Sequence, residues 1–390
     1  MPWPTEDVAA DRTLGTALSR LAMGLDRLYR RTRSMGGEST LAAEGLVPVD
    51  LWRGEPLRLA DWSAARTAVQ SLQAETASLT DAVRRAFVED TLQSLLTFVE
   101  WQAGESLPFR ERASRLLGVN IEPVPLERLA QWRRQVQHVR AAEDRHARSP
   151  ADIERVVTST LAEARRRAVE HIGPLPERPL MQLELAHDVP YTAYCDYASN
   201  TIRLNADQPF SNTRLKLLVL HEAYPGHDFH LAWRERDVHA GRQPVDSLLV
   251  ITNTPSSPLF EGIGDNGAAF LDWLEPAEMD DFALSKLRSA ACVNACLMLH
   301  EDHASVDQVH AFLVDEALRQ PRWAETRLRF MQDSLRAPFV FSYYLGYVAV
   351  AESYAAWRGP RGDFFTCLYG QMHSPRSLRV AVKHSNMRSS

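Results

Sequence analysis

Residues 217–227 read LLVLHEAYPGH, so a histidine and a glutamate directly follow four apolar residues. His221 and Glu222 on a buried helix are the residue types from which hydrolytic zinc sites are built. The second histidine, His227, follows six residues after the first. On a regular helix of about 3.6 residues per turn, this spacing leaves the two rings roughly 120° apart. A metal site therefore requires a bend or bulge, which Pro225 favours because it cannot donate a hydrogen bond to the carbonyl of His221.

A catalytic zinc ion takes three protein ligands and leaves a position for water. His221 and His227 can supply two of them. The best candidate for the third is Glu261, which lies 34 residues beyond His227 and is expected to begin the next helix. Glu222 is expected to take a proton from the attacking water as a general base. His230 is a second candidate ligand.

A single buried histidine is more often a core residue whose ring nitrogens are hydrogen-bonded than a metal ligand. Three histidines and two acidic residues fall within residues 221–230, however, and such groups are costly to bury without partners. The cluster therefore favours a metal site. Several divalent metals fit a site of two histidines and one glutamate, so zinc is expected but manganese, cobalt and iron stay open.

The composition is that of a globular protein, with 390 residues, 45% hydrophobic and 24% charged. The net charge of −6 argues against nucleic acid as a partner. No stretch approaches the roughly 20 apolar residues that a membrane span needs. Acidic residues at 6, 7 and 11 interrupt any signal peptide, and four cysteines do not indicate a disulfide framework. We therefore expect a cytoplasmic protein with no membrane partner and an oligomeric state that the sequence leaves open.

The apolar spacing is mostly helical. It predicts a helix over 13–31, two long helices over 60–103, and helices again from 282 to the end. Ser149-Pro150 is a typical helix start.

A proline-rich break at 173–179 precedes a change of pattern. Residues 190–197 and 201–205 predict a β-hairpin, followed by the metal helix with Ser211 or Asn212 as its cap. We expect an N-terminal helical region, 1–175, and a region with the chemistry, 176–390, within one globular unit.

The stretch HEAYPGH resembles the HExxPGH motif of the DUF885 family of zinc metallopeptidase-like proteins. The resemblance implies a multi-helix fold related to the gluzincins and the M32 carboxypeptidases, with a small β-hairpin or sheet before the metal helix. It also implies zinc held by His221, His227 and Glu261. Across roughly 180–385 the similarity continues through residues 194–205, Glu261-Gly262, Leu299-His300, Tyr343–Gly346 and 365–378.

The chain departs from the family at a few positions. The family's HHLQ is replaced after Pro-Gly by residues 227–230, HDFH. Ile263 stands for the tryptophan of its EGWA motif, and Asp265 for an apolar residue. The implied ligands and base are kept, so these changes bear on substrate contacts or on groups that support the ligands. The candidates for those roles are Asp228, His230, Asp265 and His300.

Tyr343 is a candidate donor to an oxyanion formed beside the metal. Its alternative is core packing, in an aromatic stripe with Tyr344 and Tyr347. His300 is a candidate substrate or supporting contact, with a surface or helix-end position as the alternative.

These observations predict a zinc-dependent hydrolase of a peptide or a small amide. One alternative keeps the metal and assigns the chain to a biosynthetic pathway, acting on a small amide, ester or related molecule. The other is a non-catalytic helical binding protein with a vestigial site.

Overall fold

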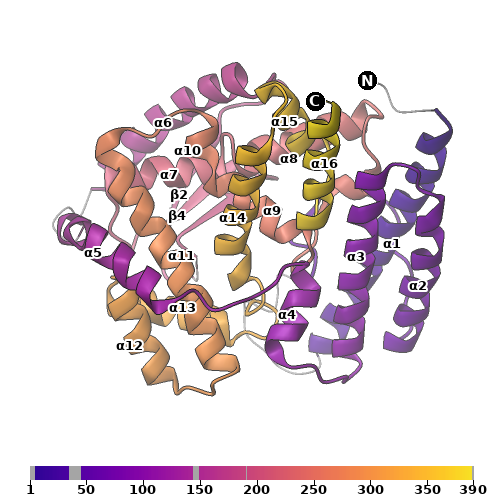
Figure 1. Cartoon of the computed structure of the whole chain (residues 1–390), viewed down its shortest axis with the longest axis horizontal. Helices are drawn as coiled ribbons and strands as arrows, with labels where there is room; N and C mark the ends of the chain where they lie inside the picture. The colour runs from indigo at the N-terminus through magenta and orange to yellow at the C-terminus, as the bar shows by residue number, and fades with distance from the viewer. Residues whose placement is uncertain (1–4, 35–44, 144–148, 190, 389–390) are drawn as a thin grey trace. The chain divides into compact units, whose positions relative to one another are not determined.

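The structure is a computed structural model that describes residues 5–34, 45–143, 149–189 and 191–388. Helices make up 66% of the chain and strands 5%, and coiled ribbons dominate Figure 1. The predicted mainly helical fold is therefore confirmed. Its narrower likeness to the gluzincins stays a prediction.

The chain divides into two compact units that are built from non-contiguous segments. The first unit comprises Met1–Asn120, Ala232–Leu259 and Glu352–Ser390, and the second comprises Ile121–Leu231 and Phe260–Ala351. Each unit thus draws on both of the sequence regions 1–175 and 176–390.

The first unit is built on long amphipathic helices. Five leucines of the predicted 13–31 helix are each at most 2% exposed, because their spacing places them on one face. The carboxylates of Asp61 and Asp81 accept backbone N–H bonds at the starts of the next two helices. Its elements are α1 (Thr5–Ser34), β1 (Val49–Asp50), α2 (Trp62–Glu75), η2 (Thr76–Ser78), α3 (Ala82–Gln102), α4 (Phe109–Leu117), η3 (Val245–Leu248), β5 (Leu249–Val250), α15 (Arg361–Gly370) and α16 (Pro375–Arg388).

The second unit holds the motif residues. Ser149 caps the helix that begins at Pro150, as predicted. Its elements are α5 (Leu126–Glu143), α6 (Pro150–His171), β2 (Gln182–Ala186), β3 (Ala193–Asp196), β4 (Thr201–Asn205), α7 (Asn212–Glu222), α10 (Gly267–Phe270), η4 (Pro276–Glu278), α11 (Met279–His300), α12 (Val306–Glu316) and α13 (Pro321–Gln332). The chain passes between the units within α8 (His227–His239), α9 (Ser256–Asp265) and α14 (Val340–Ala356).

A three-stranded sheet precedes α7, the helix that carries His221. β3 and β4 form the predicted antiparallel hairpin, with Ala193 opposite Leu204. β2 pairs parallel to β4, so the sheet order is β2-β4-β3. The sequence prediction missed β2, although its residues, QLELA, alternate polar and apolar side chains.

α11 is the core helix of the second unit. Among the described residues, the helix at 276–300 is the one long and apolar enough to cross a membrane by length and composition, which differs from the expectation that no such stretch exists. Its apolar window is 67% buried inside the protein, as expected for the core helix of a globular unit. The free thiols of Cys292 and Cys296 are buried on it.

Candidate metal centre

The helix that carries His221, α7, has a side-chain cap at its start and ends just after the histidine. The hydroxyl of Ser211 accepts the backbone N–H of Arg214 and caps α7, which confirms one of the two predicted caps. α7 ends at Glu222, and α8 begins at His227. The predicted interruption of the metal helix is therefore confirmed.

The backbone turns between the two helices at Tyr224, Pro225 and Gly226. The Tyr224–Pro225 peptide bond is cis. The N–H of Gly226 donates to the carbonyl of Leu220, six residues earlier, in place of a regular helical bond. A side chain at position 226 would clash with the carbonyl oxygen of His221, so only glycine fits this turn.

α9 carries Glu261 to the two histidines. The helix begins at Ser256, so Glu261 lies in its second turn rather than at its start, which corrects the expected boundary. Pro258 is accommodated in the first turn, where backbone N–H groups have no intrahelical acceptor. A Cβ at Gly264 would lie 2.8 Å from Nδ1 of His221, so this glycine permits the close approach of the imidazole.

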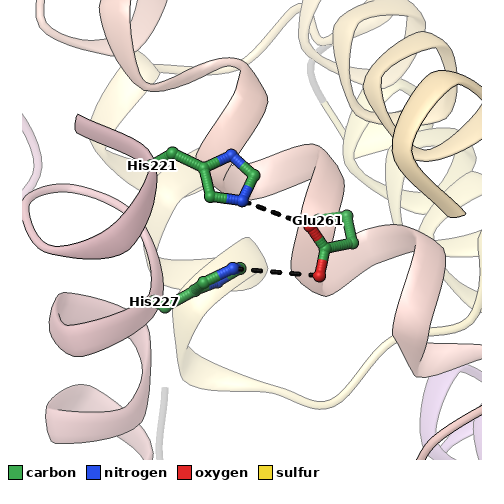
Figure 2. Close-up of side chains that lie close together, drawn as sticks. All are labelled: His221, His227 and Glu261. Carbon is green, nitrogen blue, oxygen red and sulfur yellow. Dashed lines mark hydrogen bonds and ion pairs between the residues drawn. The ribbon is translucent and has the colours of Figure 1, made fainter. Parts of the chain in front are cut away.

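The side chains of His221, His227 and Glu261 converge, as Figure 2 shows. His221 Nε2 lies 3.1 Å from Glu261 Oε2, and His227 Nε2 lies 3.8 Å from Glu261 Oε1. One ligand atom from each residue lies within 4.8 Å of the others. Tetrahedral zinc with bonds of roughly 2.1 Å places its ligand atoms about 3.4 Å apart, so the three residues fit a zinc-sized ion.

The surroundings of His227 also fit a metal. The side chain is buried, and its Nδ1 has no hydrogen-bond partner among the described residues. Its ring stacks on Phe260 at 4.0 Å between centroids. Burial and the nearby rings of His221 and His230 lower its pKa well below the ordinary value, so the ring stays neutral. Neutral imidazole is the form that binds metal.

His221 is held from its other side by a carboxylate. Its Nδ1 lies 3.1 Å from Asp265 Oδ1. The ammonium of Lys286 lies 3.2 Å from Asp265 Oδ2 and over the ring of Tyr347 at 3.9 Å. Burial raises the pKa of Asp265, but Lys286 and His221 together bring it below its ordinary value. An ionised Asp265 fixes the His221 ring with Nε2 toward Glu261.

Glu222 is buried beside the cluster. The backbone N–H of Cys195 in β3 donates a hydrogen bond to its carboxylate. Burial and the charge of Glu261 raise the pKa of Glu222 to about 7, against the opposing effect of His221. A carboxyl group with this pKa can both accept and return a proton near neutral pH.

Tyr343 lies near the cluster, in the first turn of α14. Burial and the charge of Glu261 raise its pKa, so the phenol keeps its proton and can donate a hydrogen bond. The guanidinium of Arg327 in α13 contacts it, with Cζ 5.6 Å from the ring centroid. The ring of Phe339 packs edge-on at 5.7 Å, so Tyr343 also has a packing role.

The remaining candidates take different positions. Asp228 is fully buried and lies 3.4 Å from the guanidinium of Arg178. His230 is buried with its ring 5.7 Å from that of Phe260. His300 Nε2 lies 2.8 Å from the carbonyl oxygen of Met331, a contact between the ends of two helices. Of the predicted supporting residues, Asp265 is the one with a hydrogen bond to His221.

Sequence reasoning missed Lys286 and Arg327. Lys286 is a charged residue within the largely apolar helix α11, and a buried lysine needs an acidic partner. A lysine between Leu284 and Leu287 of a core helix was therefore a usable signal in the sequence. Arg327 stands among other arginines of α13, so nothing local distinguishes it.

No family model and no curated protein matches the chain. The solved structures that are similar to it include the following two. One is "the putative lipoprotein from Colwellia psychrerythraea", with a TM-score of 0.55 at 14% identity over 82% of this chain and 66% of that one. The other is "a putative lipoprotein of unknown function from Shewanella oneidensis", with a TM-score of 0.44 at 15% identity over 82% of this chain and 72% of that one. The first likeness shows a related fold, and this chain spans just under two thirds of that protein.

Proposed function

We propose that this protein is a metal-dependent hydrolase of peptide or amide bonds, with zinc held by His221, His227 and Glu261. The observation that carries the proposal is the buried convergence of these three side chains, beside a glutamate with a pKa of about 7. Two histidines and a glutamate are a ligand set of catalytic zinc sites. The assignment to the DUF885 family stays part of this proposal.

A bound zinc ion would supply Lewis acidity and make water acidic enough to attack at neutral pH. Glu222 would take the proton from the attacking water and return it to the leaving nitrogen. Tyr343, which keeps its phenolic proton, would donate a hydrogen bond to the developing oxyanion. Asp265 would hold His221 in one tautomer throughout.

Metal analysis of the purified protein tests the proposal. We expect about one zinc ion per chain in the wild type and a loss of most of it in His227→Ala. His239→Ala is the matched control, since His239 is exposed on the same helix. Zinc absent from the wild type after reconstitution, or retained equally in His227→Ala, contradicts the proposed centre.

We keep the cytoplasm as the proposed location. The lipoprotein names belong to the two solved structures, whose low identity to this chain carries no information on its location.

A further inference from the structure

A partly buried guanidinium lies beside the metal cluster. Arg327 donates a hydrogen bond to the phenol of Tyr343 and packs against the ring of Trp323, with Cζ 5.6 Å from its centroid. The part of α14 that carries Tyr343 packs against the residue after Glu261, since a Cβ at Gly262 would clash with the carbonyl oxygen of Gly346. In the part of the chain that the structure describes, no carboxylate lies within ion-pair distance of Arg327.

The charges around the cluster leave Arg327 without a counter-charge. Lys286 pairs with Asp265. A divalent metal ion would balance the carboxylates of Glu222 and Glu261. Arg327 then remains beside the site as a positive charge without a carboxylate partner among the described residues, and it favours an anion near the metal.

We propose that Arg327 binds a carboxylate of the substrate, so that the substrates are amides or peptides with a free carboxylate near the bond that is cleaved. This inference rests on the proposed function. A guanidinium pairs with a planar carboxylate through two parallel hydrogen bonds. A single negative charge also matches a single arginine, whereas a phosphate dianion would add excess negative charge beside Glu261. Binding at Arg327 would hold the amide in one orientation at the metal.

The kinetic test uses a panel of N-benzoyl dipeptides, each compared with its C-terminal amide. A hydrogen-bonded charge contributes about 1.5–3 kcal/mol, so the zinc-loaded wild type should prefer the free acids by roughly 10- to 150-fold in kcat/KM. Arg327→Gln should bring this ratio close to one, and Arg327→Lys should keep part of it. Arg329→Gln removes the same charge from an exposed position of the same helix and should leave the ratio unchanged.

A binding test separates this inference from the hydrolase proposal. Calorimetric titration of the metal-free protein with N-benzoylglycine and with N-benzoylglycinamide should show at least about tenfold tighter binding of the acid. Arg327→Gln should lose that preference, and Arg329→Gln should keep it. Binding preference without hydrolysis of any dipeptide would remove the hydrolase proposal and leave the carboxylate site standing.

Equal treatment of acids and amides by the wild type, in rate and in binding, overturns the inference whatever the folding of the variants. The same preference in Arg327→Gln as in the wild type also overturns it.

Discussion

Two clusters of charged side chains are buried in this protein, one in each unit, and they differ in how their polar atoms are satisfied. In the first unit, Arg84 binds Asp11 at 2.7 Å and Asp246 through two bonds of 2.8 Å. In the second unit, His221 Nε2 lies within hydrogen-bond distance of Glu261 Oε2, at 3.1 Å, whereas His227 Nε2 lies 3.8 Å from Glu261 Oε1, beyond that distance. Direct ion pairs join all three side chains of the first cluster, and the second cluster is the place where we propose that a metal ion binds.

Under the proposed function, this difference separates charges that are buried to stabilise the fold from charges that are buried to bind a metal ion. Both sites bear the cost of removing charges from water. The Arg84 cluster recovers that cost through direct hydrogen bonds, so it stabilises one arrangement of helices. In the histidine cluster, His227 Nε2 faces Glu261 Oε1 at 3.8 Å without a hydrogen bond between them, as expected where the residues are arranged to bind a ligand rather than to pack.

The largest expected effect concerns Glu222. Glu222→Gln should lower kcat by roughly 10²- to 10⁴-fold, because the amide cannot accept the proton of the attacking water. Its zinc content should equal that of the wild type. Glu325→Gln, at an exposed position of α13, is the control and should keep both properties. Full activity in Glu222→Gln would show that another group acts as the base.

A substitution in the Arg84 cluster should lower the stability of the protein and leave its zinc affinity unchanged. Arg84→Met leaves two buried carboxylates without their partner, which should lower the free energy of unfolding by about 3–5 kcal/mol. Denaturant titration measures this change. The zinc affinity of the folded variant should stay at the wild-type value, and a large fall in that affinity would contradict the division of roles between the clusters.

Lys286 should affect the metal through Asp265. Lys286→Met removes the counter-charge that keeps Asp265 ionised, so zinc affinity should fall by roughly 10- to 100-fold, measured by competition with a chelating dye. Lys216→Met is the matched control, because Lys216 is also buried and pairs with Glu278 rather than with a group at the metal. Equal losses in both variants would indicate a general effect of buried lysines.

The smallest expected effect concerns His373, a buried histidine of the first unit. His373 lies 3.0 Å from the carbonyl of Cys367, and burial lowers its pKa to about 4 from 6.5. Between these values the unfolded chain binds more protons, so stability rises with pH. Acidification from about pH 6.5 to 5.5 should lower the free energy of unfolding by about 1 kcal/mol. His373→Gln should remove that contribution to the slope, and an unchanged slope would contradict it.

Local features were predicted well from the sequence. The leucine spacing of α1, the caps at Ser149 and Ser211, and the β3–β4 hairpin all depend on interactions between residues close in the chain. The start of α9 was misjudged, because a proline in a first helical turn resembles a helix breaker. β2 was missed because a parallel partner is recognised only once β4 is in place.

The sequence alone determined which residue types could form a metal centre and where the helix between them must turn. Pro225 and Gly226 impose that turn through backbone chemistry that acts within a few residues. Only the tertiary structure decided that Glu261 meets the two histidines, that Asp265 and Lys286 support one of them, and that Arg327 lies beside them. These contacts join different helices, and their distances follow from packing, which local sequence preferences do not encode.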